Sequence, residues 1–146
     1  MGLRRSEVAG LRWSNIDLDA KILTVCEGIV KIPGHGIITT GTKTGLHGYA
    51  RFELHQTTFD ALVSRYSEFG QRRLSFENKD QSNGYLFSSD LLCERPIDPD
   101  LLTKWLRKHC ASNSQIESIT FQSLRKFTSS ALEGGGVDET TASALL

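Results

Sequence analysis

The chain has 146 residues, of which 38% are hydrophobic, and 17 acidic side chains balance 17 basic ones. This length and composition are ordinary for one soluble globular domain. No apolar run approaches the roughly 20 residues of a membrane-spanning helix, and the first ten residues lack the apolar segment of a secretory signal. The zero net charge argues against a strongly basic nucleic-acid-binding chain, although a phosphate site needs only local positive charge.

The first third of the chain predicts one helix and a small sheet. Residues 4–13 have apolar positions near helical spacing, and the helix starts either with Ser6 as its N-cap or nearer Arg4. Residues 22–54 are rich in Ile, Val, Thr and Gly and predict a small antiparallel sheet. Its turns are expected around 33–36 and 45–48.

Four helices and one short strand are expected after the sheet. The first of these helices begins at Thr57 or Thr58 and is amphipathic. Residues 85–87 predict a short buried strand, and Asp98 caps a helix with Pro99 in its first position. A third helix ends at Gly134–Gly136, and Asp138 caps the last one. The apolar stripes predicted for the first three of these helices are Phe59, Leu62, Val63 and Tyr66; Leu101, Leu102, Trp105 and Leu106; and Phe121, Leu124 and Phe127. This order predicts an α+β, mostly helical fold in one domain.

The cysteines and histidines do not predict a metal site. Cys26, Cys93 and Cys110 are widely separated and odd in number, and the four histidines lack the spacing of metal ligands. We therefore expect free thiols in the reducing cytoplasm.

Three cations from separate predicted elements are candidates for binding phosphate: Arg4, Lys43 and Arg125. A guanidinium group is a planar fork of donors that matches two phosphate oxygens. If the two arginines converge, they can stabilise charge that develops on a phosphodiester in a transition state, and a lysine on a hairpin can protonate a leaving oxygen. The alternative for each is an ordinary solvated side chain, and spacing alone leaves it open. The segment "KWLRKH" is a basic helix face for which solvent exposure is favoured over contact with DNA.

At these residues the sequence resembles the tyrosine recombinases, or phage-type integrases. "GLRRSEVAGLRWSNIDLD" is similar to the first arginine motif of that family, "TKTG" to its hairpin lysine motif, and "ITFQSLRKFTSSALEGGGV" to its second arginine motif. The matching residues of the first motif are Gly2, Arg4, Glu7, Leu11, Trp13, Ser14, Ile16 and Asp17. Lys43 and Arg125 take the lysine and second arginine positions.

The resemblance implies a mostly helical α+β catalytic domain with a three-stranded sheet beside the first arginine. It also implies that the partner is double-stranded DNA. In the reaction of that family, a tyrosine attacks a DNA phosphate, a 3′-phosphotyrosyl link forms, and a 5′-hydroxyl leaves. Neither a metal nor another cofactor is needed, because the covalent intermediate conserves the ester bond energy. Several recombinase subunits act together in a synaptic complex.

Residue roles follow from the same resemblance. Arg4 and Arg125 would bind the cleaved phosphate, and Lys43 would be the general acid. Gln122 stands where the family has a histidine; its amide can donate a hydrogen bond to phosphate but cannot exchange a proton near neutral pH. Lys126 stands where the family often has another histidine, and it is a further candidate for phosphate contact.

The family's tyrosine follows its second arginine motif, whereas Tyr49, Tyr66 and Tyr85 all precede Arg125. We interpret these three as structural residues. We expect residues 1–146 to be a truncated catalytic core without the N-terminal DNA-binding domain and the C-terminal tyrosine segment. Alone it would be a monomer, inactive in cleavage and with weak, salt-sensitive DNA affinity. The alternatives are a non-catalytic remnant of a mobile element that binds DNA or a recombinase, and a helical interaction domain.

Overall fold

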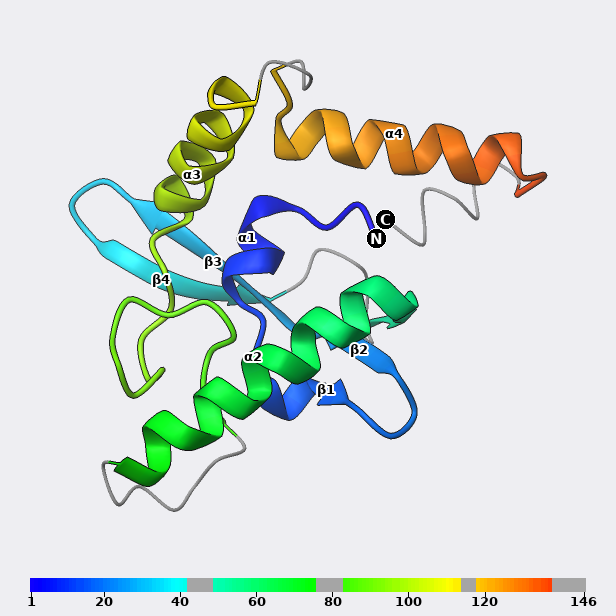
Figure 1. Cartoon of the computed structure of the whole chain (residues 1–146). Helices are drawn as coiled ribbons and strands as arrows, with labels where there is room; N and C mark the ends of the chain where they lie inside the picture. The colour runs from blue at the N-terminus through cyan, green and yellow to red at the C-terminus, as the bar shows by residue number, and fades with distance from the viewer. Residues whose placement is uncertain (42–48, 76–82, 114–117, 138–146) are drawn as a thin grey trace.

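A computed structural model of the chain describes residues 1–41, 49–75, 83–113 and 118–137 (Figure 1). The helices are α1 (Arg5–Ala9), α2 (Gln56–Ser75), α3 (Pro99–Ala111) and α4 (Phe121–Gly134), with a 3-10 turn at Trp13–Asn15. The strands are β1 (Ile16–Asp17), β2 (Ile22–Val25), β3 (Glu27–Ile32), β4 (Gly36–Gly41) and β5 (Ala50–Glu53). The α+β prediction is confirmed. The predicted turn at 45–48, Lys43 and the helix after Asp138 lie outside the described residues.

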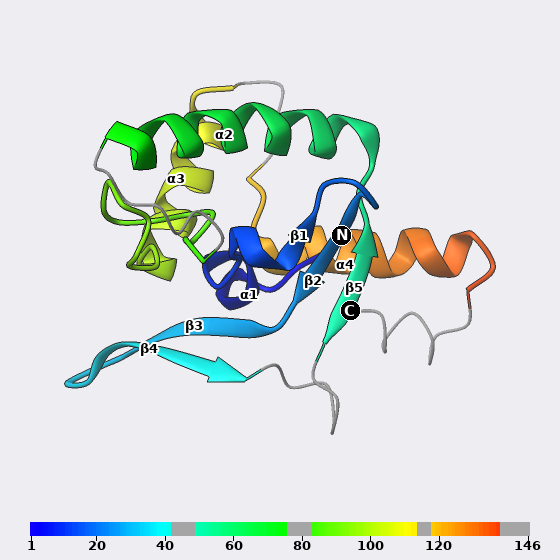
Figure 2. The same ribbon diagram turned by 90° about the horizontal axis from the view of Figure 1, so that it is seen from below.

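The strands form two antiparallel sheets rather than the single one expected over residues 22–54. Among the described residues, β1, β2 and β5 make a three-stranded sheet, and β3 pairs with β4 in a two-stranded one. The division falls at Cys26, because Val25 pairs with Ala50 while Glu27 pairs with Gly41. One nearly continuous strand therefore changes partner in its middle, and Figure 2 shows the β3–β4 ribbon extending away from the three-stranded sheet.

The main core lies between the three-stranded sheet and α2, which runs along one side of that sheet (Figure 2). Trp13 stacks on Phe69 of α2 with ring centroids 5.4 Å apart, and Leu23 and Val25 of β2 are almost fully buried beneath it. α2 begins at Gln56, one residue before the predicted cap, and only part of its predicted stripe is buried. Val63 and Tyr66 stay exposed, whereas Phe69 enters the core.

A second, smaller core joins α1, β3 and α3 through Ala9, Ile29, Tyr85 and Leu102. α1 ends earlier than the sequence predicted, with Arg4 as its N-cap and Gly10 as its C-cap. A Cβ atom at Gly10 would lie 2.7 Å from the Glu27 carbonyl oxygen, so this close approach to β3 requires glycine. Beyond Gly10 the chain is extended, and Arg12 pairs with Tyr85 in an isolated bridge. Tyr85 and Leu86 are buried as predicted, but residues 85–87 do not form the predicted strand.

α3 begins as predicted. Asp98 caps it by accepting a hydrogen bond from the Asp100 amide at 2.9 Å, and Pro99 occupies the first turn. The predicted apolar stripe of α3 is largely wrong, because Leu102 is buried but Trp105 is 62% exposed and stacks on His109.

α4 is capped by Thr120, whose hydroxyl accepts a hydrogen bond from the Ser123 amide at 3.0 Å. It ends at the predicted glycines, but none of its side chains is buried, and Phe127 is 74% exposed. Of its predicted apolar stripe, Phe121 is partly buried against the small core, whereas Leu124 and Phe127 are exposed. No helix in the described part of the chain is both long and apolar enough to cross a membrane.

Candidate functional site

Arg4 is held in place by the helix that it begins. Its backbone amide donates to Glu7 Oε2 and its Nη1 donates to Glu7 Oε1, both at 2.7 Å. The Glu7 side chain is buried against the small core, and the residue is only 7% exposed. One buried carboxylate thus fixes both the backbone and the guanidinium group of Arg4, and it leaves the other guanidinium nitrogens of Arg4 available to a ligand.

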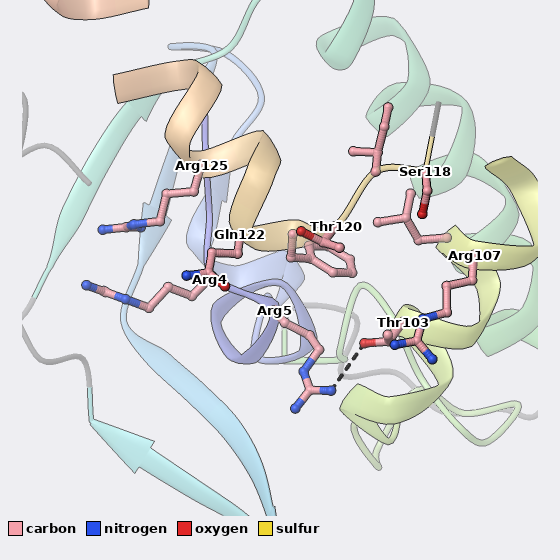
Figure 3. Close-up of a pocket in the computed structure, with 11 residues that line it drawn as sticks. Arg4, Arg5, Thr103, Arg107, Ser118, Thr120, Gln122 and Arg125 are labelled. Atoms are coloured by element: carbon pink, nitrogen blue, oxygen red, sulfur yellow. Dashed lines mark hydrogen bonds between the residues drawn. The ribbon is translucent and has the colours of Figure 1, made fainter. Parts of the chain in front are cut away.

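Arg125 reaches the same place from α4. Its Nη1 donates to the Gly2 carbonyl oxygen at 3.1 Å, which ties α4 to the segment before α1. Figure 3 shows the side chains of Arg4 and Arg125 lying one above the other and pointing in the same direction. The two arginines that the sequence places at opposite ends of the chain are therefore brought together.

The electrostatics of this pair favour an anion. Partial burial lowers the pKa of Arg125, and the positive charge of Arg4 lowers it further, while Glu7 acts in the opposite direction. Two like charges are thus held close together with a single carboxylate beside them. An anionic group between the guanidinium groups would relieve this repulsion.

Both arginines line a cavity of about 510 Å³ between α1, α3 and α4. Gln122, in the first turn of α4, lines the same cavity, so the structure brings it together with Arg4 and Arg125. Lys126 is exposed and does not line the cavity. Lys43 lies outside the described residues, so its position relative to the arginines is not described.

Five polar residues of this cavity were not predicted from the sequence: Arg5, Thr103, Arg107, Ser118 and Thr120. Arg5 donates to Asp100 Oδ1 at 2.9 Å and to Thr103 Oγ1 at 3.2 Å, which joins α1 to α3. Two features of the sequence could have indicated Arg5, Thr103 and Arg107. One is the doubled arginine at the start of α1, and the other is the four-residue spacing of Thr103 and Arg107, which puts these two residues on one helix face. The sequence interpretation treated that basic segment as a solvated face.

Neither Tyr66 nor Tyr85 lines the cavity. The Tyr85 hydroxyl accepts a hydrogen bond from Arg12 Nη2 inside the small core, and Tyr66 packs on the edge of Trp13 with ring centroids 5.1 Å apart. Tyr49 does not belong to a strand, although it falls within the sheet predicted for residues 22–54. It precedes β5 and is 68% exposed. In the described part of the chain, no group of three or more His, Cys, Asp or Glu side chains could hold a metal ion.

Comparison with known proteins identifies a family and similar folds. The family model described as the phage integrase family matches residues 1–146. The structure is similar to that of the Tn1549 transposon integrase solved in complex with transposon right end DNA, with a TM-score of 0.68 and 17% identity over 99% of this chain and 46% of that one. It is also similar to the XerA recombinase, with a TM-score of 0.64 and 19% identity over 99% of this chain and 44% of the other. No curated protein matches the chain significantly.

The chain spans less than half the length of these two solved proteins, and at these identities the likeness concerns the fold. The family match, however, covers every residue from the first arginine motif to the second. Together with a fold that joins Arg4 to Arg125, it shows that the chain belongs to the phage integrase family.

Proposed function

We propose that this chain forms the phosphate-binding part of an enzyme that cuts and rejoins DNA during site-specific recombination. The observation that carries the proposal is the pair of guanidinium groups of Arg4 and Arg125 in one cavity. A phosphodiester between them would accept hydrogen bonds from both, and the same donors would stabilise the additional negative charge of a pentacoordinate transition state.

In the proposed reaction a tyrosine oxygen forms a bond to phosphorus while the bond from phosphorus to the 5′-oxygen breaks. The leaving 5′-oxygen takes up a proton, and we assign the donor role to Lys43. The reverse reaction joins a different 5′-hydroxyl to the same phosphorus and releases the tyrosine. The bond energy stays in the phosphotyrosyl ester, so no metal or nucleotide cofactor is required for the exchange.

Gln122 has a different task from the histidine that it replaces. Its amide nitrogen can donate a hydrogen bond to a non-bridging phosphate oxygen, but the amide neither gives up nor accepts a proton near neutral pH. We therefore propose that Gln122 orients the phosphate and that proton transfer depends on Lys43.

We assign the nucleophile to a tyrosine outside residues 1–146, because none of the three tyrosines lines the cavity of the arginine pair. Tyr85 is buried in the small core, Tyr66 packs on the edge of Trp13, and Tyr49 precedes β5. In this proposal residues 1–146 are one domain, a catalytic core that works with a tyrosine segment and a separate DNA-binding domain. Its partners are double-stranded DNA and further recombinase subunits, the isolated chain is a monomer, and its location is the cytoplasm.

DNA binding by arginine variants tests the proposal. We expect Arg4→Ala and Arg125→Ala each to weaken binding of a fluorescent duplex, and to reduce the slope of log affinity against log salt by roughly one unit, because each removes one phosphate contact. Fluorescence anisotropy between low and moderate salt measures both quantities. The matched control is Arg95→Ala, which removes the same charge from an exposed position outside the cavity. Equal losses in all three variants would show that only net charge matters and would contradict the phosphate clamp.

A second candidate is a non-catalytic DNA-binding remnant of a mobile element, and the observation that favours it is Gln122 in place of the family's histidine. Both candidates predict the same DNA-binding result. They differ once a tyrosine segment is joined to the chain, because only the recombinase would then form a covalent link to DNA.

A further inference from the structure

The cavity that contains Arg4 and Arg125 continues beyond the space that one phosphate needs. Its volume is about 510 Å³, and two more arginines line it, Arg5 from α1 and Arg107 from α3. In Figure 3, Arg4 and Arg125 lie on one side of α1, while Arg5 and Arg107 lie on the other side next to Thr103. The four guanidinium groups therefore form two pairs separated by α1.

The surroundings of the second pair, Arg5 and Arg107, also contain more positive than negative side chains. Asp100 lies 2.9 Å from Arg5 Nη1 and 3.9 Å from Lys31 Nζ, so two cations share this carboxylate. Within the described part of the chain, Arg107 forms no ion pair with a carboxylate. Arg107 is exposed, and its charge is therefore available to an anion from solvent.

A neighbouring hollow extends the same surface toward the β3–β4 ribbon. Its volume is about 300 Å³, and it shares Arg5, Thr103 and Arg107 with the first cavity before reaching Lys31 and Lys104. Asp98 and Asp100 also line it, and Lys31 Nζ lies 2.6 Å from Asp98, so four cationic side chains face two carboxylates. Cationic side chains thus continue from α4, across α1 and α3, to β3. A DNA strand carries one phosphate charge for roughly every 3.4 Å of helix axis, so a surface of this kind matches a succession of phosphates better than a single one.

We propose that Arg5 and Arg107 form a second phosphate subsite, which binds a neighbouring phosphodiester of the strand whose cleavable phosphate lies between Arg4 and Arg125. The inference rests on the proposed function, because it takes the first pair as the cleavage position. Contacts to a neighbouring phosphate fix the position and direction of the strand without reading its sequence. Arg5 and Arg107 are therefore positioning residues, and Thr103 supports Arg5 through its hydroxyl group.

Asp100 controls the charge of this subsite. In the DNA-free structure it is the ion-pair partner of Arg5, so a phosphate must compete with its carboxylate for the Arg5 guanidinium group. Removing the Asp100 charge should strengthen DNA binding, which is the opposite of the effect of removing Arg5 or Arg107.

The experiment compares Arg107→Ala, Arg5→Ala with Arg107→Ala, and Asp100→Asn in duplex binding over a range of salt concentrations. Arg107→Ala is the cleanest variant, because the Arg107 side chain forms no hydrogen bond to another described residue. We expect the salt slope to fall by roughly one unit in the single variant and roughly two in the double variant. Asp100→Asn should bind more tightly than the unchanged chain. Arg95→Ala and Asp19→Asn are the matched controls at exposed positions outside both cavities, and thermal melts by circular dichroism verify folding.

The outcomes separate the two levels of the proposal. If the Arg4 and Arg125 variants lose affinity while Arg107→Ala and the double variant bind like Arg95→Ala, the second subsite is wrong and the proposed function stands. If the Arg4 and Arg125 variants also behave like Arg95→Ala, the proposed function fails and the second subsite fails with it. If Asp100→Asn strengthens binding no more than Asp19→Asn does, Asp100 does not compete with DNA for Arg5, which also overturns the subsite.

Discussion

Glu7 is the residue on which the geometry of the site depends most directly. Its carboxylate accepts both the backbone amide and the Nη1 donor of Arg4, and it is nearly inaccessible to water. The same carboxylate offsets part of the repulsion that Arg4 exerts on Arg125. A buried charge of this kind is stabilising only while its donors are present, because an unpaired buried carboxylate is strongly unfavourable.

We expect Glu7→Gln to lower the free energy of unfolding by about 1–3 kcal/mol, since hydrogen bonds to a charged group are lost in a buried position. DNA affinity should fall as well, because the Arg4 side chain loses the acceptor that orients it. Urea unfolding and anisotropy measure the two effects. Glu53→Gln, at the exposed end of β5, is the control. An unchanged unfolding free energy in Glu7→Gln would show that the buried ion pair contributes nothing to the fold.

The start of α3 shows how an element is fixed by both local and distant contacts. Asp98 accepts a hydrogen bond from Lys31 Nζ at 2.6 Å and another from the Asp100 amide at 2.9 Å. The contact with Lys31, followed by the helix amide, lowers the pKa of Asp98, and the same contact raises the pKa of Lys31. The Asp98 carboxylate therefore both caps α3 and links this helix to β3.

This arrangement predicts a dependence of stability on pH. Because the pKa of Asp98 is lower in the folded chain, its contribution to stability is complete above the unfolded value of about 3.9 and is lost as the pH falls through the folded pKa. We expect Asp98→Asn to be less stable than the unchanged chain at neutral pH, and the difference to shrink in acid. Urea unfolding from pH 7 to pH 3 measures it, with Asp19→Asn as the control. A stability difference between Asp98→Asn and the unchanged chain that stays constant over this pH range would contradict the stabilising role of the Asp98 carboxylate.

At the scale of the whole molecule, the two cores and the site are built from different parts of the chain. The cores hold α1, α2, α3 and the sheets together, whereas α4 contributes no fully buried side chain. It contacts the small core through the partly buried Phe121 and is linked to the N-terminal segment by the hydrogen bond from Arg125 to Gly2. The proposed phosphate site therefore depends on a helix with few buried contacts in this structure. We infer that a ligand bound between Arg4 and Arg125 would also stabilise the position of α4.

The placement of the tyrosines gives a prediction for the chain of 146 residues. We expect no covalent adduct when the protein is incubated with nicked duplexes of random sequence, because Tyr85 is buried in the small core, Tyr66 packs on Trp13, and neither lines the cavity of the arginine pair. Denaturing gel electrophoresis of labelled DNA detects such an adduct, and an active recombinase with its own DNA is the positive control. An adduct that disappears in Tyr49→Phe would identify Tyr49 as the nucleophile and overturn our assignment.

The sequence by itself determined the local features of this protein. Asp98 followed by Pro99 predicted the start of α3, the three glycines predicted the end of α4, and the spacing of apolar residues predicted most helices. The two arginine motifs predicted the family. These features were predictable because caps, turns and motif residues act through neighbours only a few positions away.

Only the tertiary structure decided which long-range partners meet. It divided the predicted sheet at Cys26, because one strand exchanges β5 for β4 there. It ended α1 at Gly10, where the backbone touches β3, and it left Leu124 and Phe127 of α4 exposed. It also joined Arg4 to Arg125 and added Arg5 and Arg107 to their cavity. The helical or strand periodicity of a sequence indicates which face of an element is apolar, but it does not indicate which other element covers that face. For that reason the residues of the site could be brought together only by the tertiary structure.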